Sequence, residues 1–205
     1  SGSILEIGEW VLQQACRQWC LWFRQDPLHA PSCISVNLSR SQMNFPTQLL
    51  KILARVIAET GIAPNALQLE ITEREVMGNA AAFRTLGDRI RAMGVRLAMD
   101  DFGTGVSSLG ALRALAVEAI KIDRSFVVGL ESDPDVIALV HATVALINNL
   151  GMQSIVEGIE NAAQAAILAS MGCRYAQGFY FSHPIQADQV PGYQPPVAAP
   201  TPAHA

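Results

Sequence analysis

Two adjacent aspartates, Asp100 and Asp101, follow an apolar run in the stretch VRLAMDDFGTG (95–105). Neighbouring carboxylates at the end of a buried strand repel one another, so they are costly unless cations neutralise them. With Asn37 and Glu70, which end two earlier segments, they form an all-oxygen donor set that suits Mg²⁺ or Mn²⁺. An aspartate shared by two ions about 3.5–4 Å apart is a standard part of two-metal phosphoester hydrolysis. The aspartate pair therefore predicts a two-metal site.

The polar residues that could do this chemistry share one position, the carboxyl end of a predicted strand. They are Asn37, Glu70, Asp100, Asp101, Lys121, Asp123, Glu157 and Gln177. In a (β/α)₈ barrel these strand ends converge on one rim, where active sites are built. In an open doubly wound sheet they would spread along an edge and share only a crevice. A set of carboxylates, amides and one lysine favours the barrel, because its rim brings such complementary groups together.

The elements that must position these residues alternate along the chain. Predicted strands cover 33–39, 66–72, 95–100, 117–123, 152–158 and 173–181. Predicted helices cover the segment that a Ser3/Glu6 capping box opens and that runs through Phe23, then 46–61, the segment after 72 up to Gly94, a short stretch from about Ser107, 134–150 and 161–172. Strand–helix alternation predicts parallel strands joined by right-handed crossovers. A complete barrel has eight strands and typically ~250 residues, so six strands indicate a barrel that lacks its first strand or strands and helix.

Composition narrows the class of protein. The chain has 205 residues, half of them apolar and 16% charged, which suits one compact domain with elements covered on both faces. A net charge of −4 disfavours a nucleic-acid polymer as partner. No secretion signal or long charge-free apolar run is present, and four cysteines without CxxC spacing indicate reduced thiols in the cytoplasm. The Pro/Ala-rich stretch 187–205 is typical of a disordered tail or linker.

Each candidate residue also has a structural interpretation when taken alone. Asp100 and Asp101 could cap backbone amides ahead of the helix near Ser107. A strand-end glutamate could pair with arginine on a solvated rim, and Lys121 could simply extend its ammonium group to water. Asn37 could form a turn. Solvation alone, however, does not require complementary polar groups at six strand ends.

A succession of motifs resembles a known family. IGEWVLQQACRQ, SVNLS, LQLEITE, AMDDFGTGVSSL, EAIKIDRSFV, SIVEGIE and QGFYFSHPI, in this order from about Ser3 to Ile185, are similar to the EAL domain. The resemblance implies a modified (β/α)₈ barrel that hydrolyses cyclic di-GMP to linear pGpG with two Mg²⁺ or Mn²⁺ ions. A different metal-dependent barrel phosphodiesterase is disfavoured by the motif succession.

The resemblance also implies roles for single residues. The first metal would be bound by Asn37, Glu70 and Asp100, and the second by Asp100, Asp101 and Glu157. Glu157 is also implied as the general base. These assignments give the metal pair one shared ligand, Asp100.

Four further roles follow from the same motifs. Lys121 would hold the attacking water, with Gln177 and Asp123 supporting the site or the substrate. Glu73 would fix the loop from Asp101 to Leu109. In the family this loop links the metal site to a dimer interface, so a homodimer through the loop and its neighbouring helix is expected.

The chain departs from the family pattern at several points. The Glu-Ala-Leu motif, whose glutamate is another ligand of the first metal, is absent, and in the family it lies upstream of the point where this sequence starts. We therefore expect an EAL domain over 1–186 that is incomplete at its N-terminus. Val106, Val156 and His183 replace the family's usual tyrosine, alanine and arginine, and none of these changes removes a metal ligand.

Two functions remain from the sequence. One is an active phosphodiesterase in the full-length protein, with the activity of this chain left open. The other is a catalytically impaired receptor for the same dinucleotide, which is favoured if the upstream glutamate is truly missing. A sensory or GGDEF domain is expected upstream, where a membrane anchor could also lie.

Overall fold

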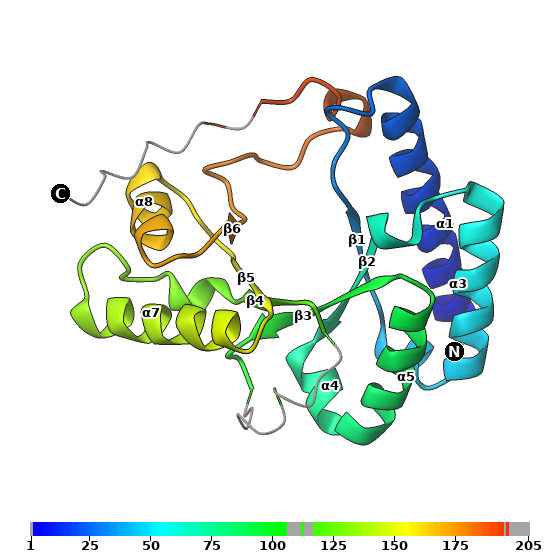
Figure 1. Cartoon of the computed structure of the whole chain (residues 1–205), viewed down its shortest axis with the longest axis horizontal. Coiled ribbons are helices and arrows are strands. Elements are labelled where there is room, and N and C mark those ends of the chain that lie inside the picture. The colour runs from blue at the N-terminus through cyan, green and yellow to red at the C-terminus, as the bar shows by residue number, and fades with distance from the viewer. Residues whose placement is uncertain (1, 106–111, 113–116, 195, 197–205) are drawn as a thin grey trace. The chain divides into compact units, whose positions relative to one another are not determined.

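The architecture is α/β, as the sequence predicts. The computed structural model describes residues 2–105, 112, 117–194 and 196. Six strands follow one another in the sheet in chain order (Figure 1): β1 Ile34–Asn37, β2 Leu67–Thr72, β3 Arg96–Phe102, β4 Ala119–Ile122, β5 Gln153–Val156 and β6 Tyr175–Ala176. The pairs β1–β2, β4–β5 and β5–β6 are parallel. This strand order confirms the predicted fold class, because consecutive strands are neighbours in the sheet and are joined by crossover connections.

The helices fall where the sequence places them. They are α1 Gly2–Gln25, α2 Arg40–Met43, α3 Pro46–Thr60, α4 Glu73–Gly78, α5 Ala80–Ala92, α7 Pro134–Asn149 and α8 Ala162–Ser170. The segment up to Gly94 holds two helices and not one, since Asn79 leaves helical geometry (φ −156°) and its side chain caps the amide of Ala82. The short helix expected from about Ser107 lies outside the described residues.

Helix α3 shows how local sequence sets its bounds. Pro46 occupies the first turn, where its missing N–H costs nothing, and Gly61 ends the helix in the left-handed conformation at φ 73°. Leu49, Leu53 and Val56 lie on one face and are buried. The spacing of these three residues directs that face into the core.

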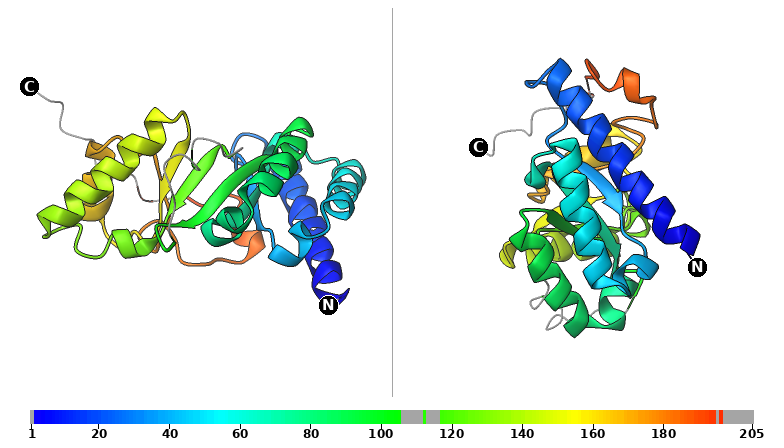
Figure 2. Two further views of the ribbon diagram at one scale, coloured as in Figure 1. Left: turned by 90° about the horizontal axis from the view of Figure 1, so that it is seen from below. Right: turned by 90° about the vertical axis from the view of Figure 1, so that its right-hand side faces the viewer.

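The chain packs as two compact units, and β3 passes from one to the other at Met99. The first unit contains Ser1–Met99 and Gln186–Tyr193, and in it α1 packs along α3 and β1 (Figure 2). The second contains Asp100–Val106 and Glu118–Ile185, and in it α7 packs against β5. Within the described part of the chain, no helix combines the length and apolarity needed to cross a membrane.

The last strand is much shorter than the sequence indicates. The pattern in 173–181 predicts a strand throughout, but only Tyr175–Ala176 are extended and paired. Beyond them the backbone turns: the backbone amides of Phe181 and Ser182 both donate to the oxygen of Gly178. The sequence pattern predicted a longer strand here because it does not reveal such a turn.

Candidate metal and catalytic site

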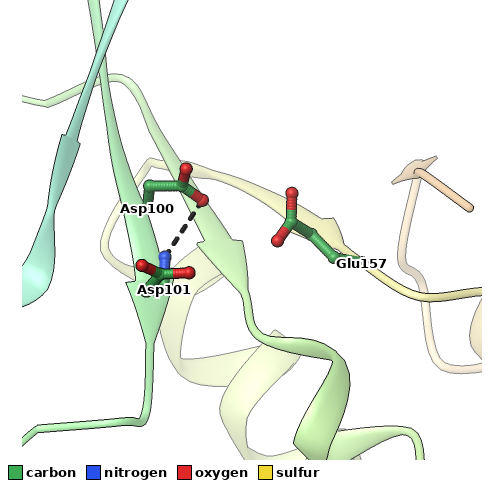
Figure 3. Close-up of side chains that lie close together, drawn as sticks. All are labelled: Asp100, Asp101 and Glu157. Carbon is green, nitrogen blue, oxygen red and sulfur yellow. Dashed lines mark hydrogen bonds between the residues drawn. The ribbon is translucent and has the colours of Figure 1, made fainter. Parts of the chain in front are cut away.

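Three carboxylates from distant parts of the second unit meet at the strand ends. Asp100 and Asp101 lie near the end of β3, and Glu157 follows β5 directly. Each offers an oxygen, and these oxygens all lie within 4.8 Å of one another (Figure 3). Such a group of like charges in a partly buried place is unfavourable by itself and suits a divalent cation.

Lys121 compensates part of this charge. Its Nζ lies 3.2 Å from Oδ1 of Asp100 and 2.8 Å from Oε1 of Glu157. The lysine side chain is only 7% exposed, and the two carboxylate side chains are 16% and 18% exposed. One ammonium thus links two carboxylates from different strands, a contact that sequence position alone did not reveal.

Asp101 has an unusual backbone. Its φ of 55° makes it the one non-glycine residue with positive φ in the described part of the chain. Aspartate tolerates this region better than most residues, and such conformations cluster at functional sites. The amide of Asp101 donates to Oδ1 of Asp100 at 3.0 Å, and the hydroxyl of Thr104 donates to the carbonyl oxygen of Asp101 at 2.9 Å. Local hydrogen bonds therefore hold the strained residue in place.

The pKa of Asp101 is raised by burial first, then by the carboxylates of Asp100 and Asp123, with Lys121 opposing the shift. A raised pKa means that the folded state binds the proton more tightly than the unfolded state. Ionised Asp101 therefore lowers stability once the pH rises above the ordinary aspartate value of 3.8. The carboxylate is held in the folded protein at a cost to stability.

The Asp101→Asn variant should therefore melt at a higher temperature than the wild type at pH 7 in metal-free buffer. Asparagine accepts the same backbone geometry but carries no charge. The difference should shrink toward zero as the pH falls below 3.8, where the aspartate is protonated in both states. Thermal denaturation in chelator across this pH range measures it. A wild type that is the more stable protein at pH 7 without metal would contradict the interpretation.

Gly103 allows the loop after Asp101 to turn. Its φ is 100°, and a Cβ at this position would overlap the ring of Phe126. The sequence pattern does not reveal the aromatic ring packed against this glycine. The rest of the loop that Glu73 is expected to fix, from Val106 to Leu109, lies outside the described residues.

Two expected supporting residues also lie at the strand ends of the second unit. Asp123 follows β4, and its Oδ1 accepts from the amide of Ser125 at 2.9 Å. The pKa of Asp123 is lowered chiefly by hydrogen bonding with the side chain of Ser125, and the bond from the Ser125 backbone amide lowers it further. Gln177 follows β6 and is exposed. Its backbone N–H donates to the backbone oxygen of Val156 at 2.8 Å. The backbone thus places Gln177 beside the end of β5, next to Glu157.

Gly178 lies where the chain approaches another backbone segment closely. A Cβ at this position would overlap the backbone oxygen and nitrogen of Ile159, two residues after Glu157. Backbone cannot move aside as a side-chain end can. The Gln-Gly pair after an apolar segment is the signal that could have indicated this close approach.

We expect Gly178→Ala to destabilise the protein by about 1–3 kcal/mol, because overpacking against backbone forces it to shift. The shift should displace Glu157 and weaken Mn²⁺ binding as well. Gly78→Ala is the matched control, since a Cβ there meets nothing within 4 Å. Chemical denaturation and Mn²⁺ titration measure both effects. Equal stability of the two variants would exclude the proposed packing.

The first unit brings together another expected pair of ligands. Asn37 ends β1 and is the register partner of Glu70 in β2. Asn37 is exposed, whereas Glu70 is 8% exposed. Glu73 opens α4 and is 1% exposed, an unusual burial for a glutamate that fits a fixed positioning role. The sharing of one metal pair between these residues and the carboxylates of the second unit stays a prediction.

Parallel βα units with polar residues at the strand ends define an α/β protein of the (β/α)₈-barrel class. Within this class the chain belongs to the EAL domain family, whose model matches residues 1–184. The chain is 40% identical over 190 residues to a Pseudomonas aeruginosa protein named bifunctional diguanylate cyclase/cyclic di-GMP phosphodiesterase MucR. This match covers 93% of the chain and 27% of MucR.

Solved structures show the same fold. A MucR phosphodiesterase structure in complex with cyclic di-GMP is 41% identical, with a TM-score of 0.84 over 92% of this chain and 75% of that one. The EAL enzyme Bd1971, in a form with cAMP and cyclic di-GMP bound, is 30% identical, with a TM-score of 0.85 over 92% of this chain and 51% of that one. The chain spans about a quarter of the length of the curated relatives it matches.

Proposed function

We propose that the protein to which this chain belongs is a metal-dependent phosphodiesterase that hydrolyses cyclic di-GMP to linear pGpG. The observation that carries the proposal is the cluster of Asp100, Asp101 and Glu157, in which the buried Lys121 links Asp100 to Glu157. The names of the MucR relative and of its complex with cyclic di-GMP support the substrate.

The donor chemistry fits divalent metal. Three carboxylate oxygens lie within 4.8 Å of one another, with the ammonium of Lys121 against two of the carboxylates, and such an all-oxygen donor set suits hard cations such as Mg²⁺ or Mn²⁺. Asp100, Asp101 and Glu157 would bind one ion, and Asn37, Glu70 and Asp100 the other. Bound ions would supply positive charge to the phosphodiester and make water more acidic.

The side chains then have distinct tasks. Lys121 orients the attacking water through its ammonium group, and Glu157 accepts the proton from that water as general base. The water oxygen forms a bond to phosphorus while the bond from phosphorus to the 3′-oxygen breaks. The 3′-oxygen leaves and takes up a proton, which gives a linear dinucleotide with a 5′-phosphate. Gln177 and Asp123 support this arrangement from the ends of β6 and β4.

The longest product of the gene that contains this chain, incubated with cyclic di-GMP and Mg²⁺ or Mn²⁺, provides the test. Separation of nucleotides by chromatography should show pGpG, and chelator should abolish it. An Asp100→Asn variant should lose Mn²⁺ binding measured by calorimetry. Tight binding of cyclic di-GMP without a linear product would assign the protein as a receptor and refute the hydrolase.

We also propose additional domains, a homodimer and a cytoplasmic location for the protein that contains this domain. The length of the relatives supports further domains, such as a sensory or GGDEF domain, and the buried Glu73 supports a regulatory loop at a homodimer interface. All four cysteines are free thiols, which supports a reducing compartment such as the cytoplasm.

A further inference from the structure

A cavity in the first unit lies apart from the expected metal ligands. It has a volume of about 600 Å³ and lies between α2, α4 and the start of α5. Neither Asn37 nor Glu70 lines it. Its volume falls within the range of pockets that take small organic ligands.

The rim of this cavity carries two guanidinium groups. Arg40 opens α2, and Arg74 lies in the first turn of α4; both are exposed. Across residues 2–105, 112, 117–194 and 196, neither arginine has an ion pair with a carboxylate. Two arginines brought to one cavity from positions 34 apart in sequence match the way proteins bind phosphate.

The one carboxylate among the lining residues does not cancel this charge. Glu75 carries a single negative charge against two positive ones, and its Oε2 already accepts from Thr72, at 3.0 Å from the hydroxyl and 3.4 Å from the amide. The lining is therefore net positive, although the chain has a net charge of −4. An anion is the favoured occupant.

The cavity lining also includes apolar side chains. Phe83 and Leu86 are each 5% exposed, Met43 is half-buried, and we call these three residues the floor of the cavity. Asn79 also lines the cavity, and its Oδ1 accepts from the amide of Ala82 at 3.1 Å. The NH₂ group of the Asn79 side chain can donate a hydrogen bond to a ligand. The cavity thus joins a cationic rim to an apolar floor with a polar edge.

We propose that this cavity binds a nucleoside phosphate, with the phosphate between Arg40 and Arg74 and the base over Phe83, Leu86 and Met43. The inference does not depend on hydrolysis of cyclic di-GMP, because the site shares no residue with the candidate catalytic cluster. Bare phosphate could use only the rim, whereas a nucleoside phosphate uses the rim and the floor.

The test follows ¹³C-methyl methionine signals of the 205-residue chain by NMR during titration with GMP, in metal-free buffer with chelator. Chelator removes divalent ions, so metal-mediated contacts at the candidate catalytic site do not contribute, and Met152 in the second unit reports on any binding there. The signal of Met43 should shift, while that of Met152, in the second unit, should not. Inorganic phosphate, as a separate probe, should bind at least tenfold more weakly than GMP.

Arg40→Gln and Arg74→Gln should each weaken GMP binding about tenfold, because each removes a charged donor to the phosphate. Arg84→Gln, an exposed arginine on α5 that does not line the cavity, is the matched control and should bind as the wild type does. Circular dichroism verifies that all three variants are folded. Equal affinity in all three, a shift at Met152 instead of Met43, or phosphate binding as tight as GMP would overturn the assignment.

Discussion

Replacement of Glu157 by glutamine should lower the turnover of cyclic di-GMP by about 10³-fold or more. General-base catalysis alone contributes typically 10²–10⁴-fold, and Glu157 is also an expected metal ligand. Glutamine keeps the size and can still accept a hydrogen bond from Lys121, which lies 2.8 Å away. The fold should therefore survive, and binding of cyclic di-GMP should fall much less than turnover.

Glu160→Gln is the matched control for this experiment. Glu160 lies three residues further along the same segment, is exposed, and is not one of the three clustered carboxylates. Rates of pGpG formation and affinities for cyclic di-GMP, measured for both variants, separate catalysis from binding. Turnover above a tenth of the wild-type rate in Glu157→Gln would remove Glu157 from the role of base.

Replacement of Lys121 by methionine should have the largest effect on stability. The Lys121 side chain is 7% exposed, and its ammonium lies within 3.2 Å of Asp100 and 2.8 Å of Glu157, so its loss removes the positive charge between these two carboxylates. Breaking a buried charge pair costs about 3–5 kcal/mol, and partial exposure of the carboxylates places the expected loss at about 3 kcal/mol. For a chain of this length, that loss lowers the melting temperature by about 10 °C.

Metal should reverse much of this loss, which separates a functional cluster from a purely structural one. Mn²⁺ would supply the positive charge that Lys121 no longer provides, so the rise in melting temperature on adding Mn²⁺ should be larger in Lys121→Met than in the wild type. Lys51→Met, at the only other lysine, is the control because Lys51 is exposed on α3. A Mn²⁺ effect equal in Lys121→Met and in the wild type would contradict the charge argument.

The sequence by itself determined the order of strands and helices and the positions of the polar residues on them. These features are local: β-branched runs, helical periodicity, and caps such as Gly61 act over a few residues. The adjacency of Asp100 and Asp101 is covalent, so their closeness needed no structure. The motif succession around them was sufficient to indicate the EAL family.

The tertiary structure decided which atoms meet. Lys121 and Glu157 lie 36 positions apart in sequence, and only the packing of β4 beside β5 places the ammonium 2.8 Å from the carboxylate. The same holds for the positive φ of Asp101, for the early end of β6, and for Gly178 against Ile159. Contacts between distant segments depend on strand register and side-chain rotamers, which are set by packing throughout the core. A local sequence pattern therefore does not predict them.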